Sequence, residues 1–192
     1  MAFIVKQAPQ STGRDNALMT RMKSGLAAMA LAGSAACSPP LNWREFTPEG
    51  SGIVASFPCR PDRVERRVML AGAGRQMALL ACEAGGMTFA LAFVDAADPA
   101  GVAATLAELR TIALRNVQAG APQVVPAQVP GMTPNAAALR LSAAGRLPDG
   151  APVHTHAAFF TRGLRAYQAT VIGAEPPLPA VQTFFDALKF PG

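Results

Sequence analysis

The sequence is poor in the residues that most often carry chemistry. Its 192 residues include two histidines, three cysteines, one tyrosine and one tryptophan, and only 15% of them are charged. It has no Cys-x-x-Cys pair and no Gly-x-Ser-x-Gly turn, which argues against a thioredoxin-like redox site and against a serine hydrolase of that type. Gly72 and Gly74 lie between two expected strands with no helix after them, so they indicate a turn rather than a phosphate-binding loop. We therefore expect no enzymatic activity and no cofactor.

Charge is also sparse and uneven. The formal net charge is +5, but four basic residues and one acidic residue precede Cys37, so the remainder carries +2. Lys189 is the single lysine of that remainder, and its arginines are scattered. A nucleic-acid-binding domain is expected to gather basic residues on one face, with aromatic residues among them in many cases. We therefore expect no nucleic-acid partner.

A stretch near the N-terminus has the features of an export signal. Arg21 and Lys23 supply a positive start, an alanine-rich apolar run covers residues 26–36, and small residues at 34–36 suit a signal peptidase. The apolar run is about half as long as the roughly 20 residues needed to cross a bilayer. It therefore predicts a cleaved leader and not a membrane-spanning helix.

The cleavage site has two interpretations. Cys37 follows the small residues directly, which resembles a bacterial lipoprotein signal, in which the cysteine is lipidated and becomes the mature N-terminus. Ser34 stands where such signals usually carry a large aliphatic residue, so ordinary cleavage just before Cys37 is the alternative. In both cases residues 1–36 form the leader, and Met19 or Met22 would start a more ordinary leader than Met1 does.

Cys59 and Cys82 remain as a pair in a chain that we expect to reach an oxidising compartment. Each comes at the end of an expected strand, with a hairpin between them, so the two strand ends can meet at one edge of a sheet. A disulfide here would close a loop of about 22 residues, worth about 3 kcal/mol in the chain-entropy model. Two separately buried thiols are the alternative. A Cys-His nucleophile is disfavoured because the disulfide would consume the thiol.

The chain after the leader begins with strand-like runs. An apolar run closed by prolines predicts a strand at residues 53–57. Residues 64–70 and 75–82 face each other across an Ala-Gly-Ala-Gly turn, which predicts a hairpin, and residues 87–94 predict a third consecutive strand. The last run is apolar enough for the middle of a sheet that is covered on both faces.

A long helix is expected next. Asp98 is placed to cap it and Pro99 to occupy its first position. Apolar residues then recur at helical spacing, namely Val102, Leu106, Leu109, Ile112, Ala113 and Val117. The helix is expected to end near Gly120, before a loop at residues 121–135 that contains four prolines.

The last part of the chain predicts more strands and a closing helix. The strands are expected at residues 136–143, 153–162 and 164–172. The helix begins near Pro177 or Pro179. Its buried residues are expected to be Val181, Phe184 or Phe185, and Leu188. Together these elements predict one α+β domain at residues 43–190, after a linker at 37–42, with an antiparallel sheet of six or seven strands, a crossing helix and a C-terminal helix.

Two motifs carry a resemblance to known proteins. The opening stretch WREFTPEGSGIVASFPCRP contains an aromatic strand and a Phe-Pro-x-x-Pro turn, and the closing stretch AVQTFFDALKF runs through Phe-Phe to an aliphatic-Lys-Phe step. Both resemble small exported bacterial proteins of unknown function, which look like members of the PsbP-like α/β/α sandwich class. The resemblance implies that fold and an exported location. It implies no catalytic residue.

His154 and His156 are the only histidines, and the period of two along a strand places both side chains on one face. They would form half of a metal site, because zinc needs two further ligands and Asp149 is the only candidate nearby in sequence. The alternative is a polar strand face directed at solvent or at a cleft.

Arg63, Arg66 and Arg67 form the densest charge cluster after the leader. Alternation along a strand separates Arg66 from Arg67, so we expect a solvated edge strand that discourages strand-to-strand aggregation. An acidic partner or a lipid headgroup is the alternative ligand of this cluster.

These features predict a small, non-catalytic exported protein of the bacterial cell envelope. We expect it to be free in the periplasm or attached to the membrane by a lipid at Cys37, and to bind or help assemble another envelope protein. The alternative function is the binding of a small ligand or a metal on the face that carries His154 and His156.

Overall fold

The computed structural model describes residues 41–192. The expected leader at residues 1–36, its cleavage site and the lipidation site Cys37 lie outside the described residues, as do residues 37–40 of the expected linker. The elements are β1 (Arg44–Phe46), β2 (Ala55–Phe57), β3 (Asp62–Leu70), β4 (Ala73–Ala84), β5 (Met87–Asp95), α1 (Pro99–Asn116), β6 (Gln123–Pro126), β7 (Leu139–Arg146), β8 (Pro152–Arg162), β9 (Arg165–Gly173) and α2 (Leu178–Asp186).

A seven-stranded antiparallel sheet forms the centre of this part of the chain. Its strand order is β3-β4-β5-β9-β8-β7-β6, and β1 and β2 form a separate two-stranded sheet. The β3–β5 meander and the β6–β9 meander meet where β5 pairs with β9. The helix α1 connects the two meanders along the chain. The predicted α+β class, with an antiparallel sheet of six or seven strands and two helices, is confirmed.

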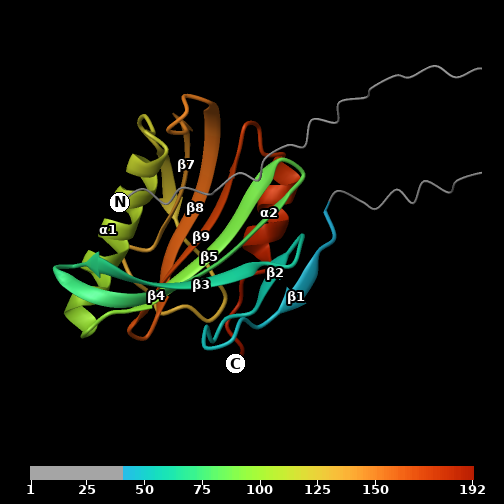
Figure 1. The fold of residues 1–192 in the computed structure, drawn as a ribbon. Helices are drawn as coiled ribbons and strands as arrows, with labels where there is room; N and C mark the ends of the chain where they lie inside the picture. The colour runs from blue at the N-terminus through green and yellow to red at the C-terminus, as the bar shows by residue number, and fades with distance from the viewer. Residues whose placement is uncertain (1–40) are drawn as a thin grey trace, which may run out of the picture. The chain divides into compact units, whose positions relative to one another are not determined.

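The two helices lie on opposite faces of the large sheet (Figure 1). On one face, α2 and the β1–β2 sheet bury an aromatic core, in which the ring centroid of Phe184 lies 5.2 Å from that of Phe57 and 5.5 Å from that of Phe89. On the other face, α1 buries its apolar stripe. The strand β5 lies inside the sheet, and most of its residues are buried, as predicted for residues 87–94.

The start of α1 follows the sequence prediction. The Asp98 carboxylate accepts a hydrogen bond of 2.8 Å from the backbone N–H of Gly101, and Pro99 occupies the first helical position. Val102, Leu106 and Leu109 are buried against the sheet. Burial of this apolar stripe, more than intrinsic propensity, holds a helix of this kind in place.

A tight turn joins β3 to β4, where a longer Ala-Gly-Ala-Gly connection was expected. Ala71 and Gly72 both adopt positive φ angles, of 49° and 73°, as a two-residue hairpin turn requires. The backbone N–H of Ala71 donates a hydrogen bond of 2.5 Å to the Glu108 carboxylate on α1. The helix therefore supports the strained alanine of the turn.

Several expected boundaries were wrong: β2 begins at Ala55, β3 at Asp62 and β4 at Ala73, each two residues from the expected start. The segment at residues 121–135 was expected to be a loop, but Gln123–Pro126 forms the edge strand β6 because β7 supplies a pairing partner. The strand expected at residues 136–143 begins three residues later, at Leu139, and extends to Arg146. The strand expected to end at Cys82 continues to Ala84.

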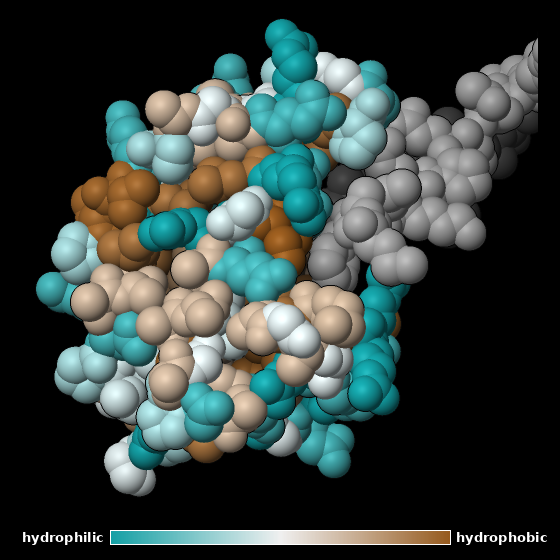
Figure 2. All heavy atoms as spheres, turned by 90° about the vertical axis from the view of Figure 1, so that its left-hand side faces the viewer, coloured by the Kyte–Doolittle hydropathy of each residue, from teal (hydrophilic) through white to brown (hydrophobic). Residues whose placement is uncertain are grey.

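Within residues 41–192, no helix is long and apolar enough to cross a membrane. Figure 2 shows the side of the molecule that carries α1, where mildly hydrophobic and hydrophilic residues alternate and strongly hydrophobic residues gather only locally. Exposed alanines of α1, including Ala103 and Ala104, belong to this helix surface.

Candidate functional site

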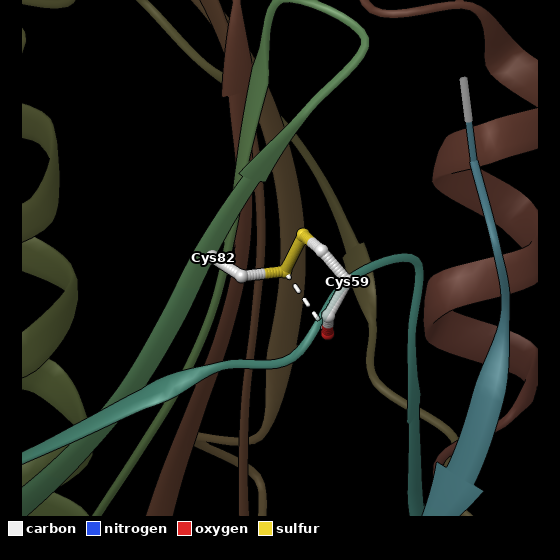
Figure 3. Close-up of a disulfide and its surroundings, with 2 residues drawn as sticks. All are labelled: Cys59 and Cys82. Carbon is white, nitrogen blue, oxygen red and sulfur yellow. Dashed lines mark hydrogen bonds between the residues drawn. A yellow bond between two sulfur atoms is a disulfide. The ribbon is translucent and has the colours of Figure 1, made fainter. Parts of the chain in front are cut away.

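The predicted pairing of Cys59 with Cys82 is present as a disulfide (Figure 3). Cys59 lies in the connection between β2 and β3, and Cys82 lies on β4. Cys82 is buried in the aromatic core, while Cys59 packs at its margin. The disulfide therefore ties the segment that follows the small sheet to the large sheet. Because both sulfurs are consumed, neither cysteine is available as a nucleophile.

The basic cluster lies on the edge strand β3, as predicted. Arg63, Arg66 and Arg67 are all exposed. The Arg63 guanidinium donates hydrogen bonds of 2.5 Å to the backbone carbonyl of Glu49 and of 2.6 Å to the Glu65 carboxylate. The Arg63 guanidinium is thus already paired within the chain, which weakens the case for an acidic ligand at this position.

A hollow of about 420 Å³ that contains an ion pair opens beside the turn between β8 and β9. Its central ion pair joins Arg165 to Asp95, with a distance of 2.6 Å from Nε to Oδ1 and of 2.8 Å from Nη2 to Oδ2. Arg165 also donates to the backbone carbonyl of Gly50. Hydrogen bonding to Arg165 lowers the pKa of the Asp95 carboxyl, against the opposing effect of partial burial.

The tyrosine of this hollow is also engaged. The Tyr167 hydroxyl donates a hydrogen bond of 2.6 Å to the backbone carbonyl of Ser51. Burial raises the pKa of Tyr167, against the opposing effect of Arg165. The neighbouring Arg162 donates to the backbone carbonyl of Pro191. Arg165 and Tyr167 therefore hold the loop before β2 onto the sheet, and Arg162 holds the C-terminus, which are structural roles.

The two histidines lie on β8 with one residue between them, so both face the side of the sheet that carries α2. His154 is exposed and His156 is half-buried. Within residues 41–192, no group of three or more His, Cys, Asp or Glu side chains is placed to hold a metal ion. The described residues therefore do not supply the further ligands that the metal hypothesis requires.

Arg140 was not predicted as a site residue, and it belongs to the same face as the histidines. The pairing of β7 with β8 places Ser142 opposite His156. Arg140 lies two residues before Ser142 on β7, so its side chain is on the same face of the sheet. The Arg140 guanidinium lies 4.2 Å from the centroid of the Phe185 ring on α2. The surroundings of His156 are therefore positively charged, which favours an anion over a metal ion.

The strand β6 forms the second edge of the large sheet, and all four of its residues are exposed. Val124 and Val125 expose 44% and 56% of their surface. Among the described residues, β6 pairs with β7 on one side and with no strand on the other. Its outer side therefore leaves backbone N–H and C=O groups available for pairing.

An apolar groove of about 720 Å³ continues from the end of β6. Pro126 belongs to both the strand and the groove. The lining carries no charged side chain and consists of Pro126, Ala127, Gln128, Val129, Pro130, Met132, Pro134, Asn135, Ala136, Ala138 and Leu139. Met132 packs against the aromatic core, and the backbone N–H of Phe190 donates to the carbonyl of Pro130, so the groove is built onto the fold.

Comparison with known proteins adds no assignment. No protein-family model matches the chain, and no curated protein has a significantly similar sequence. Function is therefore inferred from the fold and from the two surfaces described above, the edge strand with its groove and the face that carries His156.

The groove was not predictable from the sequence, because its proline-rich segment is typical of a plain loop. One signal was present, since two adjacent valines at 124 and 125 stand between prolines at 122 and 126. Arg140 was missed for another reason: it meets His156 only through the pairing of two strands, which the local sequence does not specify.

Proposed function

We propose that this protein is a non-catalytic binding or assembly factor of the bacterial cell envelope. Its edge strand β6 and the adjoining groove would take an extended, uncharged segment of another envelope protein. The protein would act in the periplasm, either free or attached to the membrane by a lipid at Cys37. The observation that carries the proposal is the continuity of an exposed, unpaired strand edge with an uncharged apolar groove.

The backbone of β6 suits strand addition. An extended peptide that adds to a sheet edge gains main-chain hydrogen bonds, and pockets for its side chains provide selectivity. Val124 and Val125 present apolar side chains on opposite faces of β6, so a β-branched or aromatic neighbour can pack beside either of them. Pro122 precedes β6 and Pro126 ends it, so an added strand can pair with only a few residues of β6.

The groove determines the chemistry of the partner segment. Since the lining holds no charged side chain, burial of a charged residue there would leave that charge without a counter-ion. Apolar side chains would instead displace water from alanine, valine, methionine and proline surfaces. A segment that runs along β6 to Pro126 would reach this groove, because Pro126 also lines it.

The exported location is supported by two features. The disulfide between Cys59 and Cys82 suits an oxidising compartment, because cytosolic thiols are mostly kept reduced. The stretch before Cys37 has the composition of an export signal. We also propose the PsbP-like class for the fold, since a large antiparallel sheet between helices on both faces is compatible with it.

The proposal is tested by photo-cross-linking in cells. A photo-reactive amino acid replaces Val125 on β6 in one variant and Val64 on β3, the opposite sheet edge, in the control. Irradiation is expected to join position 125, and not position 64, to one envelope protein of defined mass. The partner identified in this way is then purified, and its affinity is measured by calorimetry.

The double variant Val124→Lys/Val125→Lys is expected to weaken that affinity by at least about tenfold, because it places charge beside the added strand. Val64→Lys should leave the affinity within about twofold, as expected for a surface change away from the contact. Equal affinities for the double variant and the unmodified protein would overturn the proposal. An adduct with the mass of two copies of this chain would also overturn it, since it would replace the foreign partner by self-association.

A further inference from the structure

The face beside α2 carries a second surface, separate from the groove. Arg140 and Ser142 lie on β7, and His154 and His156 lie on β8. Residues at alternate positions of paired antiparallel strands share one face of the sheet. The pairs Arg140 with Ala158 and Ser142 with His156 therefore place three polar side chains, those of Arg140, Ser142 and His156, side by side.

Arg140 is held by a ring and not by a carboxylate. Its guanidinium lies 4.2 Å from the Phe185 ring centroid, within the range of a cation–π contact. In the part of the chain that the structure describes, it forms no hydrogen bond and no ion pair. Partial burial lowers the pKa of Arg140, and the more distant Asp186 carboxylate only partly opposes this effect. The N–H groups of the guanidinium remain available to an acceptor.

His156 stands next to this cation. It is half-buried and makes no hydrogen bond to residues 41–192. Burial lowers the pKa of His156, and the positive charges of Arg140 and His154 lower it further. Three groups that carry or can carry positive charge thus face one another, and Asp186 is the one carboxylate that acts on Arg140. An anion between them would relieve the repulsion.

We propose that Arg140, Ser142 and His156 form a binding site for an oxyanion, a phosphate or carboxylate group of a small ligand. The planar guanidinium presents two parallel N–H donors that match two oxygens of either group. The Ser142 hydroxyl and the His156 ring can each donate one more hydrogen bond. A metal cation would be repelled by Arg140. This site goes beyond the proposed partner groove and does not depend on it.

The test uses inorganic phosphate and the histidine signals in the NMR spectrum of the purified full chain, at constant ionic strength. The chain has two histidines, so each ring can be followed separately. At about pH 6, near the usual histidine pKa, phosphate is expected to shift the His156 ring signals, with a dissociation constant on the order of 1 mM. It should also raise the pKa of His156, because an anion stabilises the charged ring.

Matched arginine variants separate a specific site from general screening. Arg140→Gln is expected to weaken phosphate binding by about tenfold or more, whereas Arg146→Gln, the same charge change on the same strand, should alter it by less than about twofold. Arg140→Lys keeps the positive charge but lacks the two parallel N–H donors of the guanidinium, so it should give an intermediate affinity. This variant replaces Arg140→Gln in the test if Arg140→Gln does not fold.

Acetate identifies the source of the oxyanion. Competition by acetate would assign a carboxylate ligand, and binding of phosphate without acetate competition would assign a phosphate ligand; both results support the site. The proposal is overturned if sodium chloride at equal ionic strength produces the same His156 shift as phosphate. It is equally overturned if Arg140→Gln or, in its place, Arg140→Lys binds phosphate as tightly as the unmodified protein.

Discussion

The Tyr167 hydroxyl donates a buried hydrogen bond of 2.6 Å to the backbone carbonyl of Ser51, 116 residues away in the chain. It joins the loop before β2 to the central strand β9. Ser51 is completely buried, and its own hydroxyl donates to the carbonyl of Pro48. The loop that connects the two strands of the small sheet is therefore held in place by hydrogen bonds of the Tyr167 and Ser51 side chains.

Tyr167→Phe is expected to lower the free energy of unfolding by about 1–3 kcal/mol, because the carbonyl of Ser51 loses its donor while remaining buried. The ring should keep its contacts with Phe160 and Phe190, whose centroids lie 5.3 Å and 5.1 Å away, so the fold should be retained. Urea denaturation measures the change. Identical midpoints for the two proteins would show that this hydrogen bond contributes nothing.

The disulfide makes a larger contribution. Replacing both Cys59 and Cys82 by alanine is expected to lower the free energy of unfolding by about 3 kcal/mol, chiefly because the unfolded chain gains freedom. Reduction of the unmodified protein should produce a similar loss. Guanidinium denaturation of the oxidised, reduced and double-alanine forms compares the three. A reduced form as stable as the oxidised form would contradict the stabilising role of this bond.

A substitution at Gly145 on β7 tests how closely the end of α1 approaches the sheet. A Cβ atom at this position would lie 2.1 Å from the backbone carbonyl oxygen of Val117, at the end of α1. Gly145→Ala is therefore expected to destabilise the protein by about 1–3 kcal/mol, the usual cost of overpacking. Gly120→Ala is the matched control, since nothing lies within 4 Å of a Cβ atom there. Equal thermal midpoints for the two variants would refute this close approach.

Because Asp95 pairs with Arg165, we expect the free energy of unfolding to fall in acid. The folded state lowers the pKa of Asp95, so the pair contributes fully above the unfolded pKa of about 3.9 and is lost as the pH falls through the lower folded value. The contribution should be below about 1 kcal/mol, because the Asp95 side chain is 60% exposed. Thermal melts between neutral and strongly acidic pH are compared for the unmodified protein, Asp95→Asn and the control Asp62→Asn.

The unmodified protein should exceed Asp95→Asn in stability at neutral pH, and this difference should vanish in strong acid. Asp62→Asn removes the same charge from an exposed position on β3 and should show no such difference. A gap between the unmodified protein and Asp95→Asn that persisted unchanged into strong acid would exclude the titration of Asp95 as its cause.

Elements with a strong local pattern were predictable from the sequence. The capped helix α1 repeats its apolar period over many residues, and the central strand β5 is a continuous apolar run, so the local pattern and the observed burial agree in both elements. The strand β6 was not predictable, because a four-residue segment ending in proline becomes a strand only when β7 pairs with it. The histidine face shows the same limit: Arg140 and His156 meet through the register of β7 with β8.

The exported location that we propose can be tested by the mass of the native protein. The protein would be recovered from its native cell envelope without reduction, and its intact mass and peptides measured. We predict an N-terminus at or near Cys37, carrying a lipid or following simple cleavage, with Cys59 linked to Cys82. An unprocessed N-terminus with three free thiols would contradict the exported location and the envelope partner inferred from it.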